Sequence, residues 1–254
     1  MLTGDMLRRS AQRFPDKVAI VRDDTRLTYA ELNARANRLA HALVAAGLER
    51  GAKVAIVSRN LPEYGVAFFG VAKSGAVLVN VSVLYAPDEL EFVLNKADAE
   101  ALIFDAMFAE KVAAVRPKCP KLRHFLCIGE APGATPLEAF IAGHSDAEPD
   151  FGLDERDPFC MTYTGGTTGR PKGVLVNHRA REVTAHTVAL EEALDERDVV
   201  AIVTPLFHVA ALNIMFQPAV LVGATCTFVT PWSPEKFMET AARDKVTAAF
   251  MVPT

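Results

Sequence analysis

Residues 164–172 have the composition that most clearly suggests chemistry. These nine positions contain three glycines, three threonines and a lysine, Lys172, and they follow a short apolar run, 159–163, that predicts a buried strand. Glycines let the backbone turn several N–H groups towards one centre, threonine hydroxyls add further donors, and lysine supplies a positive charge. The combination predicts a loop that binds an anion, and phosphate is the anion we expect there.

The order of residues within the loop distinguishes it from a Walker A loop. A Walker A loop needs Gly-Lys-Ser/Thr in direct succession, whereas here Arg170 and Pro171 stand between the last glycine and Lys172. Pro171 also disfavours a helix running straight out of the loop, and residues 173–176 are typical of a strand. We therefore predict a strand–loop–strand phosphate site. The simpler alternative is a threonine-rich hairpin turn without a ligand.

The stretch from Tyr163 to Gly173 resembles the signature of the adenylate-forming, or AMP-binding, enzymes, which include acyl-CoA synthetases, aryl-CoA ligases, luciferases and peptide-synthetase adenylation domains. Their motif is close to Tyr-Thr-Ser-Gly-Thr-Thr-Gly-x-Pro-Lys-Gly, and a glycine replaces its serine here. In the family this change is common among fatty acyl-CoA synthetases, which favours acyl-CoA chemistry over amino-acid activation. The resemblance implies that the ATP phosphates are bound by Thr164, Gly165, Gly166, Thr167, Thr168, Gly169 and Lys172.

The resemblance also implies a two-step ligation. A carboxylic acid attacks the α-phosphate of ATP, pyrophosphate leaves, and the acyl-adenylate then reacts with the thiol of CoA. Lys172 would act catalytically by stabilising the charge that moves onto pyrophosphate, with no covalent role. Mg²⁺ is implied because it neutralises the phosphates, and the resemblance gives Thr164 a part in holding it. A solvated surface lysine is the alternative for Lys172.

A second candidate site is the sequence Pro205-Leu206-Phe207-His208, which follows a predicted strand at 199–203. Ligands bind beyond the carboxyl ends of strands in open α/β sheets, although a lone histidine there is as readily a core residue bonded to a backbone carbonyl. The family has a motif Pro-Leu-Phe-His-x-x-Gly whose histidine lies against the carboxylate end of the acyl substrate, which implies a catalytic and substrate-binding role for His208.

We expect three residues after this histidine to line an acyl pocket. They are Val209, Leu212 and Met215. Ordinary helix packing is the alternative for all three. Ala211 stands where the family often has glycine, which bears on the shape of the pocket.

Composition narrows the class of protein. The chain of 254 residues is half apolar, enough for a substantial core in one unit or two closely packed units. Its 27 basic and 31 acidic residues are dispersed, which argues against nucleic acid as a partner. The four scattered cysteines fit neither a zinc site nor a disulfide scaffold, and the sequence begins without a signal peptide, so we expect a cytoplasmic protein. The apolar window 210–229 is broken by polar residues, and we interpret it as buried core, not as an integral membrane segment.

Hydrophobic periodicity predicts strands and helices in alternation. A hairpin around Asp23–Asp24 is followed by a helix over 29–46, which begins at a Thr28/Glu31 capping box and ends at Gly47. Further strands are predicted at 54–57, 76–81, 101–104, 125–128, 159–163, 173–176, 199–203, 225–229 and 248–252, and further helices at 62–73, from 87, and at 106–116, 179–194, 209–221 and 233–243. The alternation predicts an α/β fold with mostly parallel sheets flanked by helices.

The resemblance extends over essentially the whole chain, and family members are considerably longer. We therefore interpret 1–254 as an incomplete N-terminal domain of a fatty-acid-activating acyl-CoA synthetase, with a connection or small excursion at about 129–158, the phosphate loop at 164–173, and the C-terminal lid absent. We expect the isolated chain to be inactive and to self-associate, which allows a homo-oligomer. The alternatives are an amino-acid-activating adenylation domain and a non-catalytic module that binds nucleotide or acyl ligand.

Overall fold

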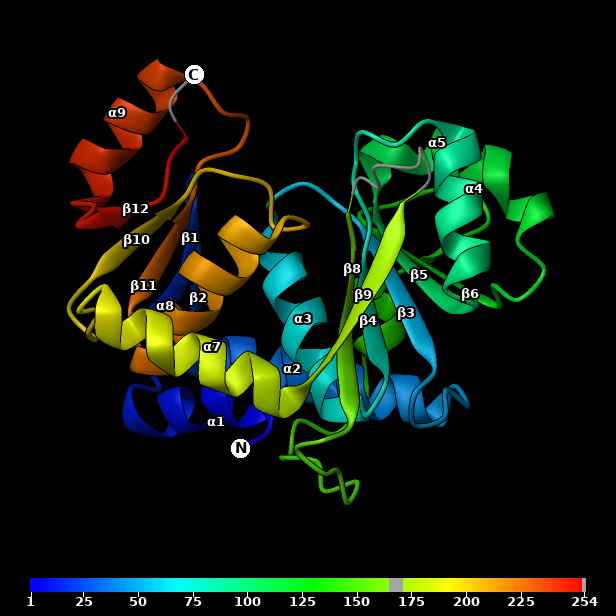
Figure 1. Cartoon of the computed structure of the whole chain (residues 1–254), viewed down its shortest axis with the longest axis horizontal. Coiled ribbons are helices and arrows are strands. Elements are labelled where there is room, and N and C mark those ends of the chain that lie inside the picture. The colour runs from blue at the N-terminus through cyan, green and yellow to red at the C-terminus, as the bar shows by residue number, and fades with distance from the viewer. Residues whose placement is uncertain (165–170, 253–254) are drawn as a thin grey trace.

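The computed structural model describes residues 1–164 and 171–252, and the strands within these ranges form two β-sheets (Figure 1). The five-stranded sheet contains, in spatial order, β12 (Ala248–Ala249), β10 (Val199–Ile202), β11 (Thr225–Phe228), β1 (Val18–Arg22) and β2 (Thr25–Thr28). The seven-stranded sheet contains, in spatial order, β7 (Thr135–Pro136), β6 (His124–Ile128), β5 (Ala99–Asp105), β3 (Lys53–Val57), β4 (Val77–Asn80), β8 (Pro158–Thr164) and β9 (Lys172–Asn177).

Helices cover both sheets and fill the space between them (Figure 1). They are α1 (Thr3–Arg13), α2 (Tyr29–Ala45), α3 (Pro62–Ser74), α4 (Pro87–Lys96), η1 (Ala106–Phe108), α5 (Ala109–Val115), η2 (Arg116–Lys118), α6 (Leu137–Ile141), α7 (His178–Glu191), η3 (Ala210–Phe216), α8 (Gln217–Val222) and α9 (Pro234–Asp244). One apolar cluster joins α2 and α3 to both sheets, and a second lies under α4 and α5 on the other side of the seven-stranded sheet.

The strand pairing confirms the predicted α/β class with mostly parallel sheets. Within the described residues, the antiparallel pairs are β1 with β2 and β8 with β9, and the other strand pairs are parallel. The crossover helices cover the faces of these parallel strands, which explains their continuous apolar sequences. The carboxyl ends of the parallel strands therefore lie together at one edge of each sheet.

A row of phenylalanine rings joins the two sheets through α3. Phe159 of β8 lies 5.2 Å from Phe68 of α3, measured between ring centroids. Phe68 lies 6.3 Å from Phe216, and Phe216 lies 5.8 Å from Phe228 of β11. All three contacts are edge-to-face or nearly so, a favoured arrangement for buried aromatic pairs. The two sheets are thus parts of one core.

The predicted capping box of α2 is confirmed. The backbone N–H of Glu31 donates to Thr28 Oγ1 at 3.2 Å, and the backbone N–H of Thr28 donates to Glu31 Oε2 at 2.8 Å. Gly47, just beyond the helix, has a φ of +79°, which a residue with a side chain rarely adopts. The predicted start of α3 near Pro62 is also confirmed.

Three predicted elements differ from the structure, the first two of them for a local reason. The helix expected over 106–116 is divided, because the Asp105 carboxylate accepts the Met107 N–H and begins a separate 3₁₀ turn. The helix expected over 209–221 starts as the π-helix η3; Pro218, which has no N–H to donate, lies at its junction with α8. The strand expected over 248–252 is only the short β12.

Candidate active site

The predicted phosphate loop joins two strands of a hairpin. β8 and β9 pair in antiparallel fashion, and Thr164 opposite Lys172 is the pair nearest the loop, so the expected strand–loop–strand arrangement is confirmed. The backbone of Thr164 is described, but its side chain is not. The predicted ligands that lie outside the described residues are Gly165, Gly166, Thr167, Thr168 and Gly169. Their roles in binding phosphate, and that of Thr164 towards a metal, stay predictions.

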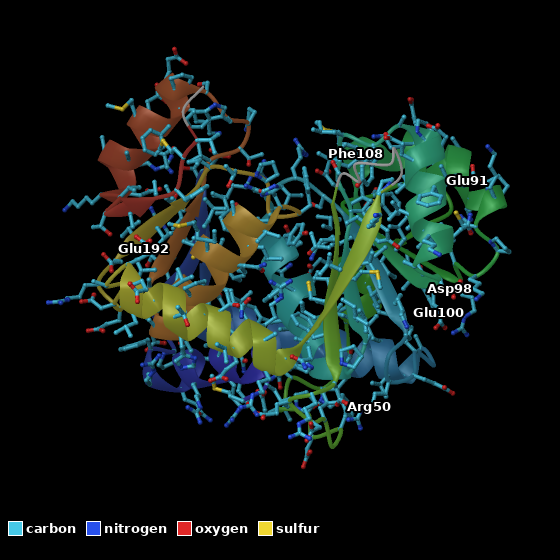
Figure 2. The ribbon with its side chains drawn as sticks, in the orientation of Figure 1. Arg50, Glu91, Asp98, Glu100, Phe108 and Glu192 are labelled. Carbon is cyan, nitrogen blue, oxygen red and sulfur yellow. The ribbon has the colours of Figure 1, made fainter. Side chains whose placement is uncertain are left out.

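The hairpin carries its loop to the carboxyl edge of the seven-stranded sheet. β8 runs parallel to β4, with Thr162 opposite Asn80, so the loop leaves the sheet where β4 and its parallel neighbours end. Figure 2 shows the two ends of the sheet: Phe108, which follows β5, lies at the end where β8 finishes and β9 begins, and Arg50, which precedes β3, lies at the other. Lys172 is exposed at the loop end of β9. The loop is therefore where parallel sheets generally bind ligands.

Gly173, the last residue of the signature, makes room for side chains of the paired strand. A Cβ there would lie 2.9 Å from Met161 Sδ and 3.1 Å from Cζ of Tyr163. Tyr163 lies directly opposite Gly173 in the hairpin and is partly buried, and this burial raises the pKa of its phenol. A glycine here lets the tyrosine ring lie across β9, next to the exposed Lys172.

The segments beside the hairpin at this edge are held by charged side chains. Arg59, just after β3, donates to both carboxylate oxygens of Asp105 at the end of β5, at 2.6 and 3.2 Å. Lys111 Nζ donates to the backbone carbonyls of Val83 and Tyr85 at 2.9 and 2.7 Å, and so fixes the segment that follows β4. The ends of β3, β4 and β5 thus form an ordered frame for the loop.

His208 lies on the turn that follows β10 of the other sheet. Its imidazole is exposed, and its backbone N–H donates to the Pro205 carbonyl at 2.9 Å. The backbone N–H of Ala210 lies 3.2 Å from His208 Nδ1, which must therefore accept. In the neutral imidazole the proton is then on Nε2. This nitrogen is available as a hydrogen-bond donor to a ligand such as a carboxylate.

The two predicted motifs meet through Asn60, which follows β3. Asn60 Nδ2 donates to the Thr204 carbonyl at 2.9 Å, and Asn60 Oδ1 accepts from the Leu206 N–H at 2.8 Å. These bonds attach residues 204–208, called the His208 turn below, to the carboxyl end of β3. Only β4 separates β3 from β8. The His208 turn and the hairpin of β8 and β9, called the phosphate hairpin below after the predicted role of its loop, therefore lie at the same edge of the seven-stranded sheet. Asn60 is not among the residues predicted for the site from the sequence.

The three predicted pocket residues occupy different environments. Val209, beside His208, has 40% of its surface exposed. Leu212 and Met215 are buried in the cluster that joins the two sheets, and Ala211 is buried with them. The packing of Leu212 and Met215 agrees with the core alternative, whereas Val209 faces solvent next to the histidine. Acyl contacts for these residues stay predictions.

The described residues contain no group of three or more His, Cys, Asp or Glu side chains placed to hold a metal ion. All four cysteines are free and buried. Among the described helices, none combines the length and the apolar character needed to cross a bilayer.

An open cavity of about 580 Å³ lies near α1, α7 and α8, but both basic and acidic side chains line it, and it contains none of the motif residues.

The described residues thus place the β8–β9 hairpin, which carries the glycine-rich sequence, at the carboxyl edge of one mostly parallel sheet, and the turn with His208 is attached to that edge from a second sheet. The AMP-binding enzyme family matches the chain over residues 7–254, and the chain belongs to this family.

Similarity to individual proteins agrees with this membership. The chain is 38% identical over 182 residues to a medium/long-chain-fatty-acid–CoA/3-oxocholest-4-en-26-oate–CoA ligase of Mycobacterium tuberculosis. The matched region covers 69% of this chain and 33% of the relative. It is 34% identical over 252 residues to a feruloyl-CoA synthase of an Amycolatopsis species, covering 97% and 48%. The crystal structure of the anthranilate CoA ligase AuaEII with anthranoyl-AMP matches with a TM-score of 0.93 at 26% identity, covering 99% of this chain and 49% of that one.

These matches establish how much of its relatives the chain represents. It spans between a third and about a half of their length. The fold is that of the corresponding part of adenylate-forming enzymes, as the sequence predicts.

Proposed function

We propose that this chain forms part of an ATP-dependent, AMP-forming acid–thiol ligase that activates a carboxylic acid and transfers the acyl group to CoA. The observation that carries the proposal is the phosphate hairpin at the carboxyl edge of the seven-stranded sheet, with the His208 turn attached to the same edge. The names of the relatives add support, because they are CoA ligases and synthetases. We infer a fatty acid as substrate class from the first of these and from Gly165 in the signature.

In the proposed reaction, an oxygen of the carboxylate forms a bond to the α-phosphorus of ATP while the bond from that phosphorus to the bridging oxygen breaks. Pyrophosphate leaves with the electron pair. Lys172, exposed at the exit of the loop, balances the negative charge that grows on the leaving group. In the second step the sulfur of CoA attacks the acyl carbon, AMP leaves, and the thiol proton is released.

His208 is proposed to orient the acid for the first step. Its Nε2–H points away from the hydrogen bond made by Nδ1, so it can donate to one carboxylate oxygen and leave the other free for attack. Magnesium enters this proposal as the MgATP substrate, and Thr164 is proposed to help hold it. We also propose that the chain acts as the N-terminal nucleotide-binding part of the enzyme, with carboxylic acid, ATP and CoA as its partners.

The test is acid-dependent exchange of labelled pyrophosphate into ATP by the complete protein that contains this sequence. We expect exchange with fatty acids and, when CoA is added, accumulation of the acyl-CoA thioester. Exchange that responds only to amino acids, with no thioester formed, would support the adenylation-domain alternative instead. Nucleotide binding without exchange for any acid in the panel would support the non-catalytic module.

A further inference from the structure

Asn60 makes an unusual connection between the two sheets. Its side chain is 4% exposed, and both ends of its amide are used by one backbone segment of the other sheet. The amide nitrogen donates to the carbonyl of Thr204, and the amide oxygen accepts from the N–H of Leu206, two residues later. A strand in a parallel ladder bonds its neighbour in this way, donating to one residue and accepting from the residue two further on. The Asn60 amide therefore takes the place of one extra strand residue beside Pro205.

The segment held by Asn60 leads directly to the histidine. Leu206 is fully buried and serves as the anchor of the turn, and the His208 N–H closes the turn on the Pro205 carbonyl. The His208 carbonyl accepts from the Leu212 N–H at 3.1 Å, and its ring accepts from Ala210. The backbone of His208 is thus fixed on both sides, and its ring is fixed at Nδ1. The outer end of this chain of hydrogen bonds is Asn60.

Because of these bonds, the position of His208 does not depend only on the five-stranded sheet that contains β10. Without the amide, the Leu206 N–H and the Thr204 carbonyl would lose their partner, and only contacts within the turn's own part of the fold, such as the burial of Leu206, would hold the turn. With it, the turn takes its position from the carboxyl end of β3, in the sheet that carries the phosphate loop. Correct placement of reacting groups to within about an ångström is worth orders of magnitude in rate.

We propose that Asn60 is a positioning residue that sets the place of the His208 imidazole relative to the phosphate hairpin. It acts through the backbone of residues 204–206 and does not touch the substrate itself. The geometric part of this inference stands on the hydrogen bonds alone. Its kinetic consequence rests on the proposed function, in which His208 orients the carboxylic acid.

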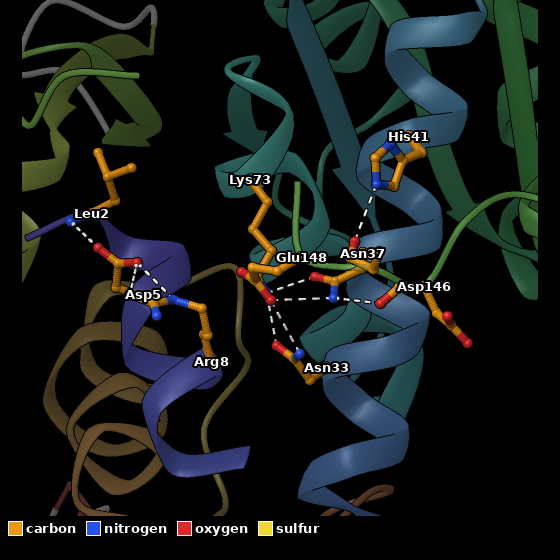
Figure 3. Close-up of polar contacts among 10 residues, drawn as sticks. Leu2, Asp5, Arg8, Asn33, Asn37, His41, Lys73, Asp146 and Glu148 are labelled. Atoms are coloured by element: carbon orange, nitrogen blue, oxygen red, sulfur yellow. Dashed lines mark hydrogen bonds and ion pairs between the residues drawn. The ribbon is translucent and has the colours of Figure 1, made fainter. Parts of the chain in front are cut away.

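A matched variant distinguishes positioning from simple stability. Asn37 is also a buried asparagine, 1% exposed, whose amide donates to the Asp146 carbonyl at 2.8 Å and accepts from Lys73 Nζ at 2.6 Å (Figure 3). It lies on α2, away from both motifs. Asn37→Ala and Asn60→Ala therefore remove the same side chain from similar burial, and both should lower the melting temperature.

The readout is the ring resonances of the histidines in the 254-residue chain, labelled with ¹⁵N and ¹³C, with His208 assigned by His208→Gln. The chain has six histidines, so five serve as internal references. We expect Asn60→Ala to shift and broaden the His208 ring signals and to leave the others unchanged, and Asn37→Ala to leave His208 unchanged. If Asn60→Ala lowers the melting temperature but the His208 signals stay at their wild-type positions, the inference is wrong.

Asn60→Asp provides the second variant in case the alanine protein does not fold. Aspartate keeps an oxygen for the Leu206 N–H but places a second oxygen against the Thr204 carbonyl, so a smaller shift of the His208 signals is expected. Unchanged signals in a folded Asn60→Asp protein would also overturn the inference.

Kinetics of the complete protein separate this inference from the proposed function. Asn60→Ala should lower kcat/KM for the acid by about tenfold or more and leave the KM for ATP within about twofold of wild type. A shifted His208 signal with unchanged acid kinetics would keep Asn60 as a positioning residue and would contradict the substrate role of His208. Unchanged signals and unchanged kinetics would overturn the inference about Asn60 and leave the role of His208 to the pyrophosphate-exchange test of the proposed function.

Discussion

Lys172 is the residue whose charge the proposed chemistry needs most. It is exposed at the first position of β9, where the phosphate loop returns to the sheet. In the complete protein, Lys172→Ala should lower the rate of pyrophosphate exchange by about a hundredfold, because the charge acts mainly as pyrophosphate departs, and should change the KM for the acid far less. Pyrophosphate-exchange kinetics measure both quantities.

A second exposed lysine gives the control for this prediction. Lys245 lies just after α9, outside the site, and Lys245→Ala should leave exchange unchanged. Lys172→Arg keeps the charge at a different geometry and should recover part of the rate. An exchange rate in Lys172→Ala equal to that of wild type would remove this lysine from the mechanism.

His178 is a buried histidine that the sequence analysis did not single out. It begins α7, its ring stacks on Phe159 with centroids 5.0 Å apart, and Thr3 Oγ1 lies 3.1 Å from its Nδ1. Among the described residues, its Nε2 has no hydrogen-bond partner. Burial lowers the pKa of His178 to about 4 from 6.5, against partial opposition from the Asp157 carboxylate. The folded protein therefore holds this ring neutral at neutral pH.

This lowered pKa predicts a loss of stability in mild acid. Above pH 6.5 the ring is neutral in both the folded and the unfolded chain, so its burial does not make stability depend on pH. Between pH 6.5 and about 4 the ring is protonated in the unfolded chain but still neutral in the folded chain, which favours unfolding. The free energy of unfolding should fall there by about 1.4 kcal/mol per pH unit, to a total of about 3 kcal/mol. Urea unfolding of wild type and His178→Gln across this range measures it. The glutamine variant should show a flatter slope; parallel slopes would mean that another group is responsible.

The packing of α2 against α3 depends on a glycine inside a helix. A Cβ at Gly70 would lie 2.8 to 2.9 Å from three side-chain atoms of Leu39, two of which are close to the α2 backbone and cannot move freely. Gly70→Ala should therefore destabilise the protein by about 1–3 kcal/mol, although alanine in place of glycine within a helix normally gains about 0.5–1 kcal/mol. Thermal or denaturant unfolding measures the difference.

A double-mutant cycle tests the cause of that destabilisation. Leu39→Ala alone should cost about 2–5 kcal/mol because it leaves a cavity. With Leu39 shortened, the added methyl at Gly70 has room, so the double variant should lose clearly less than the sum of the two single losses. Additive losses would show that the close approach at Gly70 does not limit the packing.

At the scale of elements, the sequence predicts what local chemistry determines. The Thr28 capping box, the proline at the start of α3 and the two apolar runs that flank the glycine-rich stretch each specify their element with residues a few positions apart, and the starts of α2 and α3 and the β8–β9 hairpin are confirmed. α1 (Thr3–Arg13) was not predicted. Its buried face includes Gly4 and Ser10, and the Ser10 hydroxyl donates to the Val220 carbonyl at 2.6 Å, so apolar periodicity is weak.

In the candidate site, too, only features specified by residues close together in the sequence could be predicted. Lys172 and His208 could be selected from their motifs, but Asn60, the residue proposed to relate them, could not. Asn60 lies two residues before α3, and its hydrogen-bond partner Thr204 is 144 positions away. A hydrogen bond between an asparagine and a backbone carbonyl leaves no spacing or composition signal in one sequence. Such connections become visible only when the two sheets are placed side by side.

At the scale of the whole molecule, the connection between β6 and β8 is attached to the helices by a buried lysine. Lys73 Nζ donates to Asn33 Oδ1 and to Glu148 Oε1, both at 2.7 Å, and to Asn37 (Figure 3). Burial lowers the pKa of Lys73, and the Glu148 carboxylate opposes that change. Gly4 of α1 packs on the lysine stem, since a Cβ there would lie 2.6 Å from Lys73 Cγ. One charge thus joins α1, α2, α3 and the connection.

Glu148→Gln tests whether this charge organises the region. Breaking a buried pair costs about 3–5 kcal/mol, and because the Glu148 side chain keeps 35% of its surface exposed, we expect a loss of about 1–2 kcal/mol. Amide hydrogen exchange should accelerate first in residues 142–157 and in α1, before the rest of the molecule. Arg38→Ala removes an exposed ion pair with Asp146 of the same connection and should cost at most about 0.5 kcal/mol, with no local acceleration. Equal effects of the two variants would mean that the connection is held by its surface ion pairs and that the buried lysine contributes only to local packing.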